Sequence, residues 1–477
     1  MIGRKDEVRQ LLRLYKRRSA ELVAIYGRRR VGKTYLVDEV LGDKIVFRHA
    51  GLSPLEHPAE GLMNAQLESF YYDLLLHGMA ESHCPKSWLE AFYMLEKWLQ
   101  EKDDGSRQVV FLDELPWMDT QRSGFITAFE SFWNSWGCHR KNLMVVVCGS
   151  ASSWILDNLI NNHGGLYGRV TYEIKLSPFT LQECEEFLMS EQVRLSRYDI
   201  IQSYMIFGGI PYYLRYFEAG LSLAQNVDKV FFSRNAVLKD EYDRLFASVF
   251  SNPVLMKTIV ELLYSRNTGF TRKEIREELD ISSGGTLTKC LKGLIGSDFI
   301  VKYVPFGASG KEEHYKLVDP FCLYYLHFVK NRRKTDEHFW QNNLNAPAVS
   351  IWRGYAFENV CFNHIDQIKH ALGISGVRTE CSAWSKRGKE TEGTQIDLII
   401  ERDDNVINQC EMKYYKNVFT LDKAYYLKIM NRTELLSELI SPRQVIRNTL
   451  IAPYGLKESE YSSVFTNVIT ADDLFEN

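Results

Sequence analysis

The sequence has no long apolar run and no pair of cysteines at metal-binding spacing. Its apolar stretches stay short, at six residues for 143–148 and nine for 321–329, whereas a membrane-spanning helix needs about 20. The nine cysteines are an odd number without a C-x-x-C pair, which argues against a disulfide framework and against a zinc ribbon. Residues 1–7 are charged where a signal peptide would be apolar. These absences predict a cytoplasmic protein with reduced cysteines and no membrane association.

The chain also lacks an excess of either charge. It has 58 Lys and Arg residues against 61 Asp and Glu residues, a formal net charge of −3, so any affinity for nucleic acid must come from a local basic patch. What the chain does have is length and apolar side chains. Its 477 residues, of which 45% are hydrophobic, suffice for roughly three folded domains of ~150 residues each.

The most specific motif lies at residues 27–34, which match G-x-x-x-x-G-K-[ST] between a predicted strand over 22–26 and a predicted helix over 31–41. In this context glycines let backbone N–H groups surround phosphates, Lys33 reaches the β- and γ-phosphates, and the Thr34 hydroxyl binds Mg²⁺. The motif therefore predicts ATP and Mg²⁺ as cofactors. The residues predicted to bind the nucleotide here are Gly27, Arg28, Arg29, Arg30, Val31, Gly32, Lys33, Thr34 and Tyr35.

Two further apolar segments, 109–112 and 143–148, are typical of central strands in a parallel sheet. The first ends in Asp113 and Glu114, so we expect Asp113 to hold the metal and Glu114 to act as the general base for the attacking water. The second leads to Ser150, whose hydroxyl is equally suited to sensing the γ-phosphate and to capping a helix. The pattern predicts an α/β core over residues 1–175.

Downstream of this core the pattern becomes helical, with a break at residues 208–211, and indicates a helical lid over 176–245. Three predicted helices followed by a hairpin, the order of a winged helix, occupy 246–335. Residues 245–335 hold 14 Lys and Arg against 9 Asp and Glu. Lys289 and Lys292 on the third helix, with Lys302 and Lys311 beside the hairpin, favour contact with DNA, and a protein–protein spacer is the alternative. Residues 331–350 are polar and are interpreted as a linker.

The last 130 or so residues contain a set of carboxylates in strands. A turn centred near Asp404 would place Asp397 opposite Glu411 and Gln395 opposite Lys413, with all four on one face. Two carboxylates ~5 Å apart repel each other unless a cation lies between them, which points to a divalent metal. The opposite face is expected to carry Ile396, Leu398, Ile400, Cys410 and Met412. Upstream, Glu358 falls on the predicted core-facing stripe of Ile351, Tyr355, Phe362 and Ile365, where a carboxylate needs a partner.

Residues 1–245 resemble the P-loop ATPases found mainly in archaea and some bacteria, within the AAA+/STAND group. The resemblance implies that Gly3 and Arg4 lie near the adenine, that Arg169 is an arginine finger or γ-phosphate sensor, and that Pro211 and its neighbours couple the nucleotide to the lid. A surface arginine in a glycine loop is the alternative for Arg169, and a finger acting in trans would require a homo-oligomer. The resemblance is carried by Ile2-Gly3-Arg4, residues 27–34, Leu112-Asp113-Glu114, Cys148-Gly149-Ser150, Leu166-Tyr167-Gly168-Arg169, Leu176-Ser177-Pro178-Phe179 and Gly208-Gly209-Ile210-Pro211.

The C-terminal set resembles the PD-(D/E)XK restriction-endonuclease-like nucleases over 346–477. By this resemblance Asp397 and Glu411 bind Mg²⁺, and Glu358 holds metal or water from the first helix. Lys413 orients the attacking water or stabilises the charge of the phosphorane. The sequence departs from the pattern at Gln395 and has no proline before Asp397. Surface salt bridges on an edge hairpin are the alternative interpretation.

The expected protein is thus α/β, with an AAA+-type core, a lid, a winged helix and a nuclease-like domain. Its function would be ATP hydrolysis coupled to a metal-dependent nuclease that acts on nucleic acid, with DNA favoured as partner. The alternative is a nucleotide-switched regulator that binds nucleic acid or protein and whose C-terminal domain does not cut. A small-molecule kinase is disfavoured because no second substrate pocket is evident.

Overall fold

The computed structural model describes residues 1–54, 61–161, 164–247, 252–282, 284–308, 312–330, 336–386 and 394–476. The chain divides into two compact units, which are described separately. The first unit consists of Met1–Ser177, Asp243–Met256 and Gly285–Asp298. The second consists of Pro178–Tyr242, Lys257–Gly284 and Phe299–Asn477.

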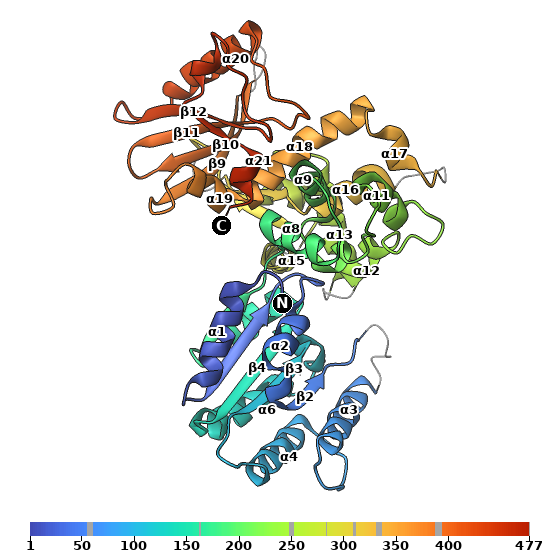
Figure 1. The fold of residues 1–477 in the computed structure, drawn as a ribbon. Helices are drawn as coiled ribbons and strands as arrows, with labels where there is room; N and C mark the ends of the chain where they lie inside the picture. Colours follow the sequence, from blue (N-terminus) through green and yellow to red (C-terminus); the bar gives the residue numbers. More distant parts are fainter. Residues whose placement is uncertain are drawn as a thin grey trace. The chain divides into compact units, whose positions relative to one another are not determined.

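A five-stranded sheet of order β2-β3-β4-β1-β5 forms the centre of the first unit (Figure 1). All its pairings are parallel, and every residue of β1 and β4 is buried, as expected for strands covered on both faces. The predicted parallel sheet is confirmed. Its strands are β1 (Glu21–Tyr26), β2 (Ile45–Ala50), β3 (Gln108–Asp113), β4 (Leu143–Gly149) and β5 (Tyr172–Lys175).

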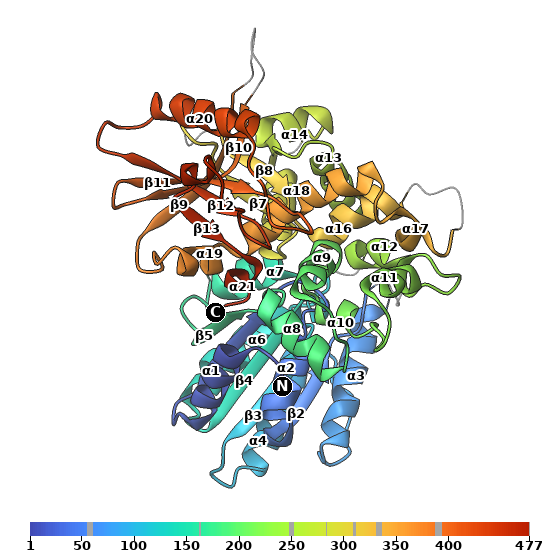
Figure 2. The same cartoon turned by 45° about the horizontal axis from the view of Figure 1, so that its top comes forward.

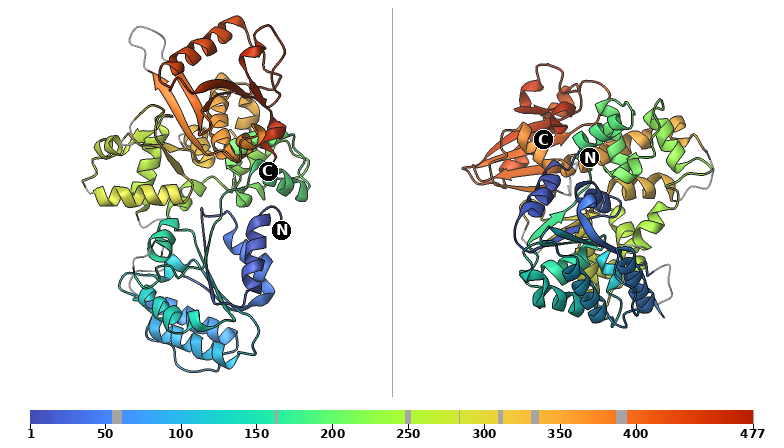
Figure 3. Two further views of the ribbon diagram at one scale, coloured as in Figure 1. Left: turned by 90° about the vertical axis from the view of Figure 1, so that its left-hand side faces the viewer. Right: turned by 60° about the horizontal axis from the view of Figure 1, so that its bottom comes forward.

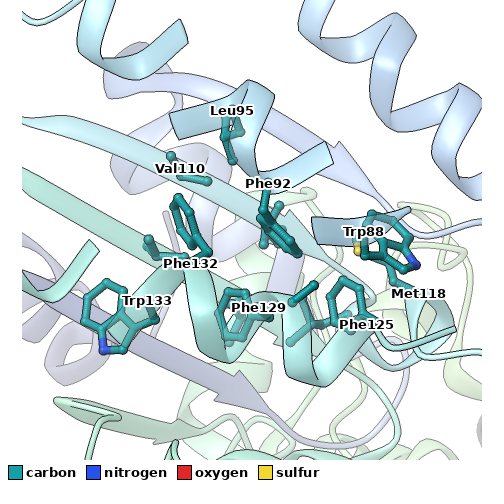
Figure 4. Packing of buried hydrophobic residues seen from close by; sticks show 14 of the residues in the cluster. Trp88, Phe92, Leu95, Val110, Met118, Phe125, Phe129, Phe132 and Trp133 are labelled. Atoms are coloured by element: carbon teal, nitrogen blue, oxygen red, sulfur yellow. The ribbon is translucent and has the colours of Figure 1, made fainter. Parts of the chain in front are cut away.

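Helices cover both faces of this sheet (Figure 3). On one face, α4 and α6 pack together through an aromatic layer, in which Trp88 and Phe92 meet Phe125, Phe129 and Phe132 (Figure 4). The rings of Trp88 and Phe125 lie 4.9 Å apart at 83°, an edge-to-face geometry that adds about 1 kcal/mol to the burial. The helices are α1 (Lys5–Lys16), α2 (Lys33–Leu41), α3 (Leu62–Leu76), α4 (Trp88–Glu101), α5 (Leu115–Met118), α6 (Phe125–Ser135) and α7 (Ser152–Ile155).

Residues 241–318 contain the elements expected of the winged-helix segment in the expected order. The capping box of Thr271 and Glu274 is confirmed at the start of α14, and β7 and β8 form the expected antiparallel hairpin, to which β6 adds a strand. Residues 285–298, which include most of α15, belong to the first unit. The elements are α12 (Glu241–Ala247), α13 (Pro253–Tyr264), β6 (Phe270–Thr271), α14 (Arg272–Glu278), α15 (Gly284–Gly296), β7 (Ile300–Tyr303) and β8 (His314–Leu317).

The second unit contains a further five-stranded sheet of order β13-β12-β11-β10-β9, beside which α20 lies (Figure 2). Its strands are β9 (Thr379–Lys386), β10 (Thr394–Arg402), β11 (Val406–Met412), β12 (Val445–Ile451) and β13 (Asn467–Ile469). The other helices of this unit are α8 (Leu181–Ser190), α9 (Arg197–Phe207), α10 (Pro211–Leu214), α11 (Leu223–Phe231), α16 (Pro320–Tyr324), α17 (Phe339–Asn343), α18 (Pro347–Asn363), α19 (Ile365–Ala371), α20 (Lys423–Ser437) and α21 (Ala471–Leu474).

The predicted linker over 331–350 is wrong in its second half. Residues 331–335 lie outside the described residues, but α17 and the start of α18 follow them, and Trp340 is completely buried. The carboxylate of Asp228 accepts hydrogen bonds from the Trp340 and Gln341 amides at 2.7 and 3.1 Å. The polar composition of this segment therefore gave no indication that Trp340 is buried. Within the described parts of the chain, no helix combines the length and the apolar character needed to cross a bilayer.

Candidate functional site

The predicted phosphate-binding loop connects β1 to α2, as its motif requires. Gly27 has φ 145°, and a Cβ atom there would lie 2.2 Å from the carbonyl oxygen of Leu176. Gly32 has φ 94° and Arg30 has φ 73°, both in the left-handed region. Both motif glycines therefore adopt backbone conformations that other residues rarely adopt. Gly27 also leaves no room for a side chain, because the end of a neighbouring strand lies close to it.

Lys33 is buried at the start of α2. Its Nζ donates hydrogen bonds to the carbonyl oxygens of Gly27 and Arg28, both at 3.1 Å, and to Ser150 Oγ at 3.0 Å. Burial lowers the pKa of the Lys33 ammonium, and the nearby Glu114 carboxylate opposes that change. The loop thus holds a cation in its centre.

Thr34 and Asp113 meet where β3 ends. The Thr34 hydroxyl donates to Asp113 Oδ2 at 2.7 Å. Burial raises the pKa of Asp113, while the hydrogen bond from Thr34 lowers it. A hydroxyl and a carboxylate oxygen at the mouth of the loop are the hard ligands that Mg²⁺ prefers, so these residues fit the predicted ion.

Glu114 lies beside Asp113 in a left-handed conformation, with φ 45°. Both its carboxylate oxygens accept from Ser150, Oε1 from the hydroxyl at 2.6 Å and Oε2 from the amide at 3.0 Å. The helix-capping alternative for Ser150 is wrong, because Ala151 precedes α7 and no side chain caps it. Instead, Ser150 links Lys33 to Glu114, a contact that the sequence analysis missed although all three residues were singled out.

Arg4 brings the start of the chain to this loop. Its guanidinium is buried, and Nη2 donates to the Val31 carbonyl oxygen at 3.3 Å. Gly3 and Arg4 are both left-handed, with φ 61° and 57°. Arg28 is buried and Arg29 partly buried, whereas the Tyr35 side chain is exposed. Proximity of Gly3 and Arg4 to an adenine stays a prediction.

Two other predicted residues are not brought into this network. Arg169 follows Gly168 in an exposed turn of the first unit, and its side chain is exposed. Pro211 is the first residue of α10 and belongs to the second unit. Their roles in sensing nucleotide and in coupling it to a lid stay predictions.

The end of α15 lies against the first unit's core. The Ser297 and Ser152 hydroxyls are 3.4 Å apart, and Asp298 accepts from Lys175 Nζ at 2.5 Å. Burial raises the pKa of Asp298, and among the charges that lower it is Arg28 of the phosphate-binding loop. The charge of Arg28 in the loop thus acts on Asp298, which follows the end of α15.

The four lysines predicted to face DNA have different surroundings. Lys292 forms an ion pair with Asp157 at 3.6 Å, and Lys302 forms one with Glu313 at 2.8 Å. Lys289 is exposed on α15. Lys311 lies outside the described residues. The basic excess of this segment is thus partly neutralised by neighbouring carboxylates.

The predicted strand register in the second unit is confirmed. Leu398 pairs with Cys410 and Ile400 with Asn408, which places Asp397 opposite Glu411. The predicted faces are partly wrong, because β10 shifts register against β9 between Ile396 and Ile399. Owing to this irregularity Ile396 packs in one apolar cluster with Ile399 instead of on the opposite face.

Glu411 is held by three donors. Its carboxylate accepts from Lys413 Nζ at 2.8 Å, from Arg432 Nη1 at 2.5 Å and from the Tyr425 hydroxyl. Burial alone would raise the pKa of Glu411, but the Lys413 and Arg432 charges lower it below its usual value. Lys413 Nζ lies 5.1 Å from the Tyr425 ring. Arg432 and Tyr425 come from α20 and could not be assigned from the strand pattern.

The charges of Glu358 and Asp397 act on a buried lysine from β8. Lys316 is buried, and the opposing charges that raise its pKa against the effect of burial are Glu358 and Asp397. Burial and the Asp397 charge raise the pKa of Glu358 to about 8. Asn267 Nδ2 donates to Glu358 at 3.3 Å, and Gln395 Nε2 donates to Asp397 at 2.5 Å.

Glu358 on α18 is buried, as predicted. The stripe of residues that was expected to be buried with it is wrong. Ile351 and Tyr355 are exposed, and α18 instead buries the face that contains Trp352, Phe357 and Glu358 itself.

These contacts bear on the predicted metal at Asp397 and Glu411. Glu411 has three donors, but burial and neighbouring carboxylates raise the pKa values of Glu358 and Asp397, so the repulsion among the three carboxylates is only partly compensated. Within the described residues, no three His, Cys, Asp or Glu side chains form a metal-binding group. A metal ion held by Asp397 and Glu411 stays a prediction. The charged cluster consists of Glu358, Asp397, Glu411, Lys316, Lys413 and Arg432.

Comparison with known proteins agrees with the geometry of the first unit. Residues 1–217 match a family model described as an ATPase domain predominantly from Archaea. This match supports a P-loop ATPase and ATP hydrolysis, and it leaves the winged helix and the nuclease-like domain as predictions.

A relative and two solved structures are similar over more of the chain. An uncharacterized protein of Methanocaldococcus jannaschii is 24% identical over 414 residues, 85% of each chain. The Walker-type ATPase of Pyrococcus abyssi is 18% identical, with a TM-score of 0.44 over 68% of this chain and 96% of its own. The Aeropyrum pernix ORC2 protein, in its ADPNP–ADP complexes, is 13% identical, with a TM-score of 0.40 over 69% of this chain and 94% of its own.

Proposed function

We propose that the first unit binds ATP with Mg²⁺ and hydrolyses it. The observation that carries this proposal is the joining of Lys33, Thr34, Asp113, Glu114 and Ser150 by hydrogen bonds at the carboxyl edge of the parallel sheet. Thr34 and Asp113 would hold Mg²⁺, which neutralises phosphate charge when bound. Lys33 would exchange its carbonyl partners for phosphate oxygens.

Glu114 is the proposed general base. Its carboxylate lies one residue beyond the proposed metal ligand, where it can accept a proton from an attacking water. The two hydrogen bonds from Ser150 fix its orientation, and both oxygens are engaged. Each oxygen keeps a second lone pair that can accept from the attacking water, so Ser150 is a positioning residue.

The test compares Glu114→Gln with wild type, and exposed Glu101→Gln serves as a matched control. Glutamine keeps the size and a hydrogen-bond acceptor but cannot take a proton. We expect equilibrium ATP binding to be retained and phosphate release to fall at least a hundredfold in Glu114→Gln alone. Unchanged phosphate release in this variant would refute the assignment of the base.

We further propose an AAA+/STAND-type switch in which the nucleotide acts on α15. The proximity of Arg28 to Asp298 and of Ser152 to Ser297 supports this coupling. Exposed Lys289 is the proposed contact with DNA phosphates. Lys289→Glu should weaken binding to a DNA duplex and flatten its salt dependence. If wild type and variant bind the duplex with the same affinity and the same salt dependence, this contact is excluded.

For the C-terminal domain the charged cluster favours the non-cutting alternative. Glu411 accepts from Lys413, Arg432 and Tyr425, so its carboxylate is already engaged without a metal ion. We propose that this domain binds nucleic acid or protein and does not cleave nucleic acid. The test is cleavage of single- and double-stranded DNA and RNA with Mg²⁺ or Mn²⁺, with and without ATP. Cleavage by wild type that disappears in Glu411→Ala would instead establish the nuclease.

A further inference from the structure

The second unit contains a cavity of about 730 Å³ that is separate from the charged cluster. Its walls come from the first turns of α9 and α11 with the segments before them, from Leu344 and α18, and from two loops of the C-terminal sheet. Cavities of roughly 300–1,000 Å³ are typical of small-molecule sites. Its lining includes Arg194, Tyr198, Asp199, Arg353, Lys416 and Tyr454.

Arg353 is the buried cation of this cavity. Its side chain is 7% exposed, and Nη1 donates to the Leu344 carbonyl oxygen at 2.9 Å. Its Nε has no hydrogen-bond partner, and within the described part of the chain no ion pair neutralises the guanidinium. A buried charge without a counter-ion destabilises the fold, so the cavity is suited to an anion.

Other groups add positive potential at the same place. Arg194 and Lys416 are exposed at the cavity, and Asp199 is its one acidic lining residue. Asp199 is also engaged by the Ser196 hydroxyl at 2.8 Å. The N-terminal ends of α9 and α11, 11 and 9 residues long, carry the positive ends of their helix dipoles to the lining.

An aromatic stack lies next to these cations. The Tyr198 ring stacks on Tyr414 at 4.3 Å and on Tyr454 at 5.8 Å, with interplanar angles of 14° and 21°. Tyr454 is 48% exposed, so part of its ring faces solvent. A planar ring of this kind can bind a nucleobase by stacking.

We propose that this cavity binds a phosphorylated nucleoside, with the phosphate at Arg353, Arg194 and Lys416 and the base against Tyr454. The phosphate supplies the missing counter-ion, and the base extends the tyrosine stack. Both a free nucleotide and a nucleotide within a nucleic-acid strand present this chemistry. The site lies outside the ATPase unit and does not depend on ATP hydrolysis.

The test uses full-length Lys33→Ala protein, so that the phosphate-binding loop does not contribute to binding. The probes are thymidine 5′-monophosphate, measured by calorimetry, and a 5′-phosphorylated oligothymidylate, measured by fluorescence anisotropy. We expect Arg353→Met to weaken binding at least tenfold. Exposed Arg443→Glu, outside the cavity, is the matched control and should bind as its parent does.

A second pair of variants covers the case that Arg353→Met fails to fold. The double change Arg194→Glu and Lys416→Glu affects only exposed side chains and should also weaken binding at least tenfold, and Tyr454→Ala should weaken it several-fold. Equal affinity for the two probes would identify the ligand as a free nucleotide. Tighter binding of the oligonucleotide would identify it as a nucleotide within a strand. Failure of both probes to bind, or affinity unchanged in the double variant, would overturn the proposal.

Discussion

At the residue scale, the chemistry of the first unit depends on which atoms each side chain reaches. The P-loop motif allowed Lys33 and Thr34 to be predicted from sequence, because the loop leaves few alternatives to those residue types. The link from Ser150 to Glu114 could not be predicted, since it joins two strand ends and depends on the left-handed conformation of Glu114. Single side chains at strand ends are thus foreseeable, and their mutual contacts require the structure.

The Ser150 link predicts a selective effect on turnover. Ser150→Ala removes one of the two hydrogen bonds that orient Glu114 and one acceptor for Lys33. We expect kcat for ATP hydrolysis to fall at least tenfold, about 1.4 kcal/mol, while KM changes less than threefold. Exposed Ser190→Ala is the control. If KM rises and kcat does not fall, Ser150 binds nucleotide instead of positioning Glu114.

Buried His364 predicts a pH dependence of stability in the second unit. Its Nε2 accepts from the Leu181 amide at 3.0 Å, its Nδ1 lies 2.8 Å from the Val360 carbonyl oxygen, and burial lowers its pKa from 6.5 to about 4. The unfolded chain therefore takes up a proton below pH 6.5 that the folded chain does not. Stability should fall by up to about 1.4 kcal/mol per pH unit between pH 6.5 and 4.

Calorimetry of wild type and His364→Gln at pH 7.5 and 5 checks this prediction. Glutamine can keep an acceptor for the Leu181 amide without titrating. The decrease in Tm between the two pH values should be smaller in the variant. An equal decrease would show that other groups control the acid sensitivity.

At the element scale, periodicity and turn position were good guides to strands. The β10–β11 register followed from one turn centre, because antiparallel pairing leaves no freedom once the turn is placed. The shift between Ile396 and Ile399 was not foreseeable, since it depends on pairing with β9. The prediction of the buried stripe on α18 was wrong. An amphipathic pattern shows that a helix has two faces, but tertiary packing decides how far each face is covered.

The loop between β1 and α2 carries an element-scale prediction. Gly27→Ala would place a Cβ atom 2.2 Å from the Leu176 carbonyl oxygen in a backbone conformation that side chains rarely adopt. We expect ATP affinity to fall at least tenfold. Gly42→Ala, where a Cβ has no neighbour within 4 Å and φ is −48°, should bind ATP as wild type does. Similar affinities for both variants would show that the loop tolerates the displacement.

At the scale of the whole molecule, sequence order predicted the kinds of element but not how distant segments share a unit. Residues 285–298 join the ATPase core, and the Arg353 cavity combines residues from 192 to 454. Neither follows from a local pattern, since each arises from long-range packing. The charged cluster likewise includes Lys316 from β8 and Arg432 from α20, which lie outside the β10–β11 hairpin.

Exposed Arg169 predicts a behaviour of the assembled protein. If it acts in trans, ATP should promote association of the chain, and Arg169→Ala should lower turnover at least tenfold while ATP binding persists. Sedimentation with and without ATP, together with phosphate release, tests both parts. A chain that stays monomeric with ATP and still hydrolyses it normally would exclude a finger acting in trans.

The central claim is that the first unit hydrolyses ATP through the loop around Lys33. Its most direct test is phosphate release from Mg²⁺-ATP by purified wild type, by Lys33→Ala and by Lys141→Ala, which changes an exposed lysine outside the site. The loss of the one ammonium at the centre of the loop should abolish turnover, and Lys141→Ala should match wild type. Hydrolysis by Lys33→Ala at the wild-type rate would contradict the claim.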